Sequence, residues 1–212
     1  MQNHLRYELH NVLSGKSEVR FGAIIQAITC YLKDGEKTGV ALEGGKYFKS
    51  EETERLENYV TRNNLWIKEI DLSNYVSEGA EQKVYLKDTE HVLKLNDSIY
   101  YTSWKDYLYN LLLHNHFFSD TAYELIGFIK DNDILYSVVQ QSYVVITHNT
   151  DLSQVKTFLT QNGFQNNRNN DYYNPELGII LEDLHDENVL TRNGVLYFID
   201  TVFFLKEQFW LP

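Results

Sequence analysis

Cysteine is almost absent from this sequence, since Cys30 is the only one among 212 residues. A single thiol excludes an internal disulfide, and its apolar neighbours indicate a buried helix face, which suits a reducing compartment. Basic residues are also scarce, because 19 Lys and Arg stand against 30 Asp and Glu, a formal net charge of −11. Without a basic cluster to follow a phosphate backbone, we predict no direct binding of nucleic acid.

Long apolar runs are missing as well. No uncharged stretch approaches the roughly 20 residues that span a membrane, and the opening residues MQNHLR lack the apolar segment of a signal peptide. We therefore expect a cytoplasmic protein with no membrane partner. What the sequence does contain is 43% hydrophobic and 14% aromatic residues, enough apolar surface for a substantial core.

A predicted hairpin near the end of the chain brings two oxygen-bearing side chains together. The pair Asn193-Gly194 between apolar segments is typical of a tight β-turn. If these two residues form the turn, Asn188 lies opposite Ile199, and the Asn188 amide and the Asp200 carboxylate face the same volume. Such oxygens, completed by phosphates and water, are the ligands that Mg²⁺ prefers.

The loop before this hairpin carries a second carboxylate, Asp183, which we predict to accept a proton from an attacking hydroxyl. Residues 183–188 read DLHDEN. This motif resembles the D-L-H-x-x-N loop of aminoglycoside and choline phosphotransferases and shares the D-x-x-x-x-N spacing of protein kinases. Residues 77–200 as a whole resemble the kinase-like domain of bacterial polyvalent proteins from mobile elements. The alternative is an acidic surface turn in which Asp200 caps a strand.

The resemblance implies a role for each of these residues. Asp183 would act as the base, Asn188 and Asp200 would bind Mg²⁺, and His185 would brace the loop by hydrogen bonds. It also aligns residues 77–84 with the glycine-rich loop G-x-G-x-x-G-x-V, in which only Gly79 and Val84 match. A turn before a strand explains Gly79 equally well.

Lys94 lies inside an otherwise apolar predicted strand, residues 91–95. A buried ammonium is costly unless an anion meets it, and the position resembles the kinase lysine that binds ATP phosphates. If the preceding turn is centred on Thr89, Val84 and Lys94 lie opposite each other. The alternative is a charge on an edge strand that prevents aggregation.

In kinases a helix glutamate holds this lysine. The matching predicted helix, residues 103–114, has Asp106 as its only acid. Aspartate is one methylene shorter, so either the helix packs closer, or the pair is absent, or the partner comes from elsewhere. The resemblance also places the adenine-binding hinge at residues 140–143 and thereby implies contacts from Gln140, Gln141 and Tyr143.

These observations predict an α+β protein with a reduced protein-kinase-like fold. An N-terminal helical appendage covers residues 1–70, and a minimal kinase-like domain covers residues 71–212. Its small lobe, about residues 71–140, is expected to be a five-stranded antiparallel sheet with one helix. Its large lobe, about residues 144–212, is expected to be short. Within that lobe we expect a surface loop at 165–170 and a turn at 171–175.

The predicted function is ATP- and Mg²⁺-dependent transfer of a phosphoryl group to an unidentified hydroxyl, on a small molecule or a protein. Two alternatives remain: a pseudokinase that binds nucleotide without turnover, and an interaction protein that binds no nucleotide. The N-terminal helices and the C-terminal aromatic segment, residues 203–211, are the predicted surfaces for a protein partner.

Overall fold

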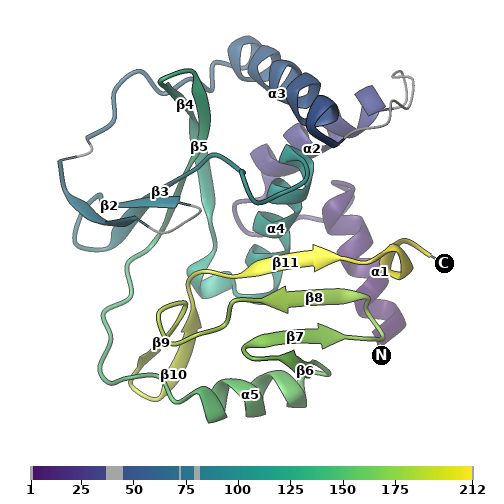
Figure 1. Ribbon diagram of the computed structural model, residues 1–212, viewed down its shortest axis with the longest axis vertical. Helices are drawn as coiled ribbons and strands as arrows, with labels where there is room; N and C mark the ends of the chain where they lie inside the picture. Colours follow the sequence, from purple (N-terminus) through teal and green to yellow (C-terminus); the bar gives the residue numbers. More distant parts are fainter. Residues whose placement is uncertain (1, 37–44, 72, 79–81, 212) are drawn as a thin grey trace.

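The computed structural model describes residues 2–36, 45–71, 73–78 and 82–211, and Figure 1 shows their arrangement. Three helices come first, followed by a sheet interrupted by one helix and then by a second, mainly β part. The mixture of helices and antiparallel sheets confirms the predicted α+β class. The first helices are α1 (Gln2–Leu13), α2 (Ala23–Glu36) and α3 (Gly45–Arg62).

The middle of the chain forms the predicted five-stranded antiparallel sheet, in the order β1-β2-β3-β5-β4. Helix α4 (Trp104–Phe117) connects β3 to β4 and is buried over most of its length. The strands are β1 (Tyr75–Glu78), β2 (Gln82–Leu86), β3 (His91–Asn96), β4 (Glu124–Asp131) and β5 (Ile134–Ser142).

The C-terminal part contains a four-stranded sheet in the order β11-β8-β7-β6, a hairpin of β9 and β10, and helix α5 (Leu152–Gln161). In Figure 1 this sheet lies between α5 and α4. Its strands are β6 (Gln165–Arg168), β7 (Asp171–Asn174), β8 (Ile179–Glu182) and β11 (Val202–Leu205); the hairpin strands are β9 (Val189–Arg192) and β10 (Val195–Phe198).

Two local predictions in this part were wrong. Residues 165–170 were expected to be a loop and residues 171–175 a turn, but they contain β6 and β7. Every residue of β6 is exposed, so it is a polar edge strand without the alternation that reveals a strand in a sequence. Asn169, at φ 47°, lies in the turn between them.

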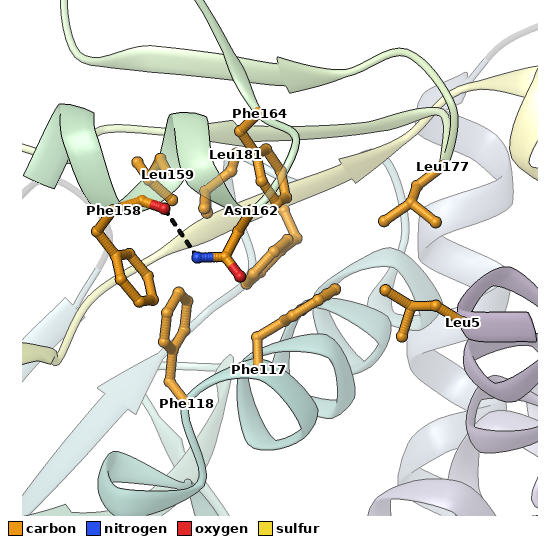
Figure 2. Close-up of a pocket in the computed structure, with 10 residues that line it drawn as sticks. Leu5, Phe117, Phe118, Phe158, Leu159, Asn162, Phe164, Leu177 and Leu181 are labelled. Atoms are coloured by element: carbon orange, nitrogen blue, oxygen red, sulfur yellow. Dashed lines mark hydrogen bonds between the residues drawn. The ribbon is translucent and has the colours of Figure 1, made fainter. Parts of the chain in front are cut away.

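A shared hydrophobic core joins all three parts. Helix α4 packs against α1, α2 and α3 on one side and against β11, and in Figure 1 it lies at the centre of the molecule. Figure 2 shows a small apolar pocket of about 130 Å³ where α1, α4, α5 and the four-stranded sheet meet. Leu5 of α1, Phe117 of α4, Leu181 of β8 and Leu177, from the connection between β7 and β8, all line it.

Helix α3 is also attached to α4 by polar contacts. Glu52, which is buried, accepts hydrogen bonds from the backbone N–H groups of Trp104 at 2.6 Å and Lys105 at 3.1 Å. Ser103 caps the next N–H, that of Asp106, through its hydroxyl at 3.0 Å. Together the two side chains satisfy the first three free N–H groups of α4, which every helix leaves without an internal partner.

Replacing Glu52 with glutamine should therefore destabilise the protein by about 1–3 kcal/mol. One acceptor oxygen becomes an NH₂ group that faces a backbone N–H. Urea unfolding would measure the loss. Glu54→Gln, an exposed change on the same helix, is the matched control and should stay within about 0.5 kcal/mol of the parent protein. Equal effects of both changes would refute the capping role of Glu52.

Candidate active site

Lys94 is a buried residue of β3 that lines a cleft. Strand β3 pairs with β2 so that Val84 and Lys94 are opposite each other, which confirms the register predicted from a turn centred on Thr89. Only 3% of the residue is exposed. Its Nζ donates to the Ile199 carbonyl at 2.8 Å and lies 3.9 Å from Asp200 Oδ2. Burial lowers the pKa of Lys94, and the Asp200 charge offsets part of that effect.

The predicted hairpin brings Asp200 beside Asn188. Strands β9 and β10 pair as expected around Asn193 (φ 52°) and Gly194 (φ 80°), the left-handed conformations that such a turn requires. The Asn188 carbonyl then accepts from the backbone N–H groups of Ile199 at 2.9 Å and Asp200 at 3.4 Å. Partial burial raises the pKa of Asp200, whose side chain is 31% exposed, although Lys94 works in the opposite direction.

The acidic loop holds Asp183 by its neighbours. Asn188 Nδ2 donates to both the Asp183 carbonyl, at 2.8 Å, and Asp183 Oδ2, at 2.9 Å. His185 Nδ1 accepts from the Glu187 N–H at 3.3 Å, and its Nε2 lies 3.4 Å from Asp183 Oδ1. His185 therefore braces the loop, as predicted. The side chain of Asp183 is 59% exposed, so its carboxylate is accessible at the surface.

The contacts of Asn188 fix the orientation of its amide. An asparagine side chain can be turned either way in a structure, and only its hydrogen bonds tell nitrogen from oxygen. Both Asp183 oxygens accept but never donate, so the nitrogen must face them. The Oδ1 atom is left on the other side of the amide, and among the described residues it makes no hydrogen bond.

A cleft of about 300 Å³ connects these groups, a size that suits a small molecule. Its polar lining includes Lys94, Asn188 and Asp200. Its apolar lining comes from both sides of the cleft: Val76, Val84 and Val92 belong to the five-stranded sheet, and Leu190 belongs to the hairpin. Its remaining lining residues are Ser77, Gln82, Gln141, Ser142, Tyr143, Val144, Glu187 and Ile199.

Most of the predicted site residues lie on this cleft. Val84, Gln141 and Tyr143 line it, whereas Gln140 does not. The Gln140 side chain instead accepts a hydrogen bond from Lys87 Nζ, because neighbouring residues of a strand point to opposite faces. Gly79 lies outside the described residues.

Sequence reasoning missed Gln82 as a group in the cleft. Its Nε2 donates to Asp200 Oδ2, so a side chain from β2 reaches the carboxylate on the cleft floor. Strand alternation could have found it, since Gln82 is two residues from Val84 and shares its face. The same rule would have found Val92, two residues before Lys94.

The acid of α4 does not meet Lys94. Asp106 lines a different pocket, of about 200 Å³, together with Thr102 and Phe204. Among the described residues the carboxylate nearest the Lys94 ammonium is that of Asp200. The structure therefore corresponds to the third alternative, in which the partner of Lys94 comes from elsewhere in the chain.

Comparison with known families decides where this chain belongs. A family model described as a serine/threonine/tyrosine kinase found in polyvalent proteins matches residues 49–207. The chain belongs to this kinase family. Neither the curated proteins nor the solved structures gave a match. The matched segment begins within α3, the helix whose Glu52 caps α4.

Two further observations concern the described part of the chain. Within the described part of the chain, no three His, Cys, Asp or Glu side chains gather closely enough to hold a metal ion by themselves. Among the helices that the structure describes, none has the length and hydrophobicity that crossing a lipid bilayer requires.

Proposed function

We propose that this polyvalent-protein kinase transfers the γ-phosphoryl group of ATP to a hydroxyl, with Mg²⁺ as cofactor. The observation that carries the proposal is the convergence of Lys94, Asn188 and Asp200, drawn from distant parts of the sequence, on one cleft of small-molecule size. Catalysis of phosphoryl transfer depends mostly on positioning and charge neutralisation, so few residues suffice.

The adenine ring would occupy the apolar part of the cleft, between Val84 and Val92 of the sheet and Leu190 of the hairpin. The expected hinge side chains of Gln141 and Tyr143 also border this region. An aromatic base in an apolar cleft gains from burial of its faces. The Lys94 ammonium would meet the phosphates at the inner end.

Backbone groups of the segment after β5 would pair with the polar edge of the base. The Tyr143 N–H donates to the Glu90 carbonyl at 2.7 Å, toward β3. Because backbone groups alternate in direction along a strand, those of Ser142, the last residue of β5, turn away from β3, and Val144 follows two residues later. Both residues line the cleft. They are better candidates for the hinge contacts than Gln140.

The residues present suit a magnesium ion held jointly with phosphates. The Asp200 carboxylate and the Asn188 Oδ1 atom are hard oxygen donors, and the Asn188 nitrogen is already committed to Asp183. Two protein oxygens with phosphates and water are typical of magnesium sites. When bound, the ion would neutralise charge on the phosphates.

Asp183 would take the proton of the acceptor hydroxyl. As that oxygen bonds to the γ-phosphorus, the bond between the γ-phosphorus and the β–γ bridging oxygen breaks, and ADP leaves with the electron pair. The contact from Asn188 leaves the second carboxylate oxygen of Asp183 near His185 and solvent. An exposed base suits either a small acceptor or a protein acceptor, which remain the two classes we propose.

A nucleotide-binding pseudokinase is the second candidate, and one observation favours it. Gln82 bonds to one of the two carboxylate oxygens of Asp200, the proposed metal ligand. Nucleotide binding without turnover would result if this contact persisted in the complex.

We also propose a domain organisation. Residues 71–212 would form the kinase-like domain, with a small lobe to about residue 140 and a short large lobe from about residue 144. Residues 1–70 would be a helical appendage that braces α4, and this surface or the aromatic segment at residues 203–211 would contact a protein partner.

Thermal unfolding with and without Mg²⁺-ATP tests the proposed function, together with an assay of ATP turnover. A ligand at about 100 times its Kd stabilises the native state by about 2.7 kcal/mol, which raises Tm by roughly 5–10 °C for a chain of this size. Lys94→Met should abolish the shift. Lys83→Met is the control, because this neighbouring β2 lysine lies over the Tyr136 ring. No shift in the parent protein would end the proposal.

A further inference from the structure

Besides Asp200, two other groups contact the Lys94 ammonium. Its ammonium donates to the Ile199 carbonyl at 2.8 Å and lies over the ring of Tyr123, 5.4 Å from the ring centre. The face of an aromatic ring attracts a cation within about 6 Å, most strongly where water is excluded. Tyr123 is only 3% exposed, so its ring meets this condition.

The hydroxyl of Tyr123 makes the same contact as the lysine. It donates to the Ile199 carbonyl at 2.8 Å, so the two side chains converge on one oxygen with two lone pairs. Burial, with the nearby Asp200 charge, raises the pKa of Tyr123 well above its ordinary value. The hydroxyl therefore stays a neutral donor over the whole range in which Lys94 is charged.

Two residues of helix α4, Asn115 and His114, contact Tyr123. Asn115 accepts from the Tyr123 N–H at 2.7 Å and donates to its carbonyl at 2.8 Å, so one buried amide satisfies both backbone groups. The ring of His114 lies 4.4 Å from that of Tyr123. The same Asn115 nitrogen also donates to the Arg20 carbonyl at 2.9 Å, which ties this arrangement to the segment between α1 and α2.

We propose that Tyr123, fixed to α4 by Asn115, is the positioning residue that holds the Lys94 ammonium at the cleft floor. In this arrangement the face of the Tyr123 ring and the shared Ile199 carbonyl, and not an acid of α4, hold the ammonium. Helix α4 then positions the Lys94 ammonium through the Asn115 amide and the Tyr123 ring. The consequence for catalysis rests on the proposed function, because only a bound nucleotide offers Lys94 a phosphate.

The decisive measurement is an NMR titration of Lys94 in protein labelled with ¹³C-lysine, with Lys94→Met to assign the signal. Tyr123→Phe keeps the ring, whereas pentafluorophenylalanine at position 123 keeps its shape and reverses the charge distribution of its face. We expect the pKa of Lys94 to be roughly one unit lower in the fluorinated protein than in Tyr123→Phe. Equal titration midpoints would overturn the proposal.

The same pair of substitutions at Tyr107 provides the control. Tyr107 is equally buried, at 2% exposure, and its hydroxyl accepts from Ser137 Oγ at 2.7 Å. Fluorination there should leave the Lys94 midpoint unchanged. If fluorination at position 107 shifted the Lys94 midpoint as much as fluorination at position 123, fluorination of any buried ring would have this effect. That result would also overturn the proposal.

Kinetics separate this inference from the proposed function. In the fluorinated position-123 protein we expect kcat for ATP turnover to fall about 10–100-fold relative to Tyr123→Phe, because the ammonium is misplaced. The KM for ATP should stay within about threefold. If the parent protein turns over no ATP, the proposed transfer fails, but the titration still decides whether Tyr123 positions Lys94.

Discussion

Asp183→Asn should lower the rate of phosphoryl transfer by roughly 10²–10⁴-fold, the usual contribution of a general base. The change removes the proton acceptor and replaces the oxygen near His185 Nε2 with an NH₂ group. Asp183 has φ 65°, a left-handed conformation that asparagine also tolerates. The new amide oxygen still accepts from Asn188 Nδ2. Autophosphorylation or ATP hydrolysis measures the effect.

The control for this variant is Asp186→Asn, an exposed aspartate of the same loop, which should keep the parent rate. The increase in Tm with Mg²⁺-ATP should be the same in both variants, because neither residue lines the cleft. An Asp183→Asn protein as active as the control would remove Asp183 from the mechanism. A loss of nucleotide binding would instead assign it to binding.

Asp200→Asn should weaken the Mg²⁺-dependent binding of ATP by about 100-fold or more, because a metal held by few protein oxygens loses its anionic ligand. The parent protein should also show a pH effect. Burial raises the pKa of Asp200, and the protonated acid cannot bind the metal. Affinity for Mg²⁺-ATP should therefore fall about tenfold per pH unit below that pKa. This fall should exceed any change of affinity with pH in Asp200→Asn, which lacks the carboxylate.

Titrations with a fluorescent ATP analogue at successively lower pH would measure this prediction. Asp133→Asn, in the exposed turn between β4 and β5, is the control and should keep the parent pH dependence. The raised pKa has a second consequence with the opposite sign. In the metal-free protein the charged form of Asp200 is disfavoured, so its contribution to stability is present at low pH and is lost as the pH rises through that pKa. A pH dependence unchanged in Asp200→Asn would contradict both statements.

The parts of the site that could be predicted are those set by short-range geometry. Asn193-Gly194 fixes a two-residue turn. The register of the two strands then follows, and it places Asn188 opposite Ile199. The turn centred on Thr89, between the paired residues Leu86 and Val92, places Val84 opposite Lys94 in the same way. In both hairpins the chain needs no distant partner to choose its register.

The parts that could not be predicted depend on contacts across the fold. Gln82 meets Asp200 although they are 118 positions apart, and Tyr123 reaches the Ile199 carbonyl across 76. Nothing near Tyr123 in the sequence distinguishes it from the other tyrosines. The polar strand β6 was not predicted for a related reason. An edge strand with two exposed faces shows no alternation of apolar and polar residues.

The sequence by itself therefore determined the family, the acidic loop and the registers of two hairpins, because turn chemistry and strand alternation act within a few residues. Only the tertiary structure decided what surrounds the lysine: Asp200 on one side, the Tyr123 ring on another, and no acid from α4 among the described contacts. The physical reason is that a buried ammonium takes whichever acceptors and π-faces the packed core brings to it, and packing of distant segments is not encoded in any local pattern.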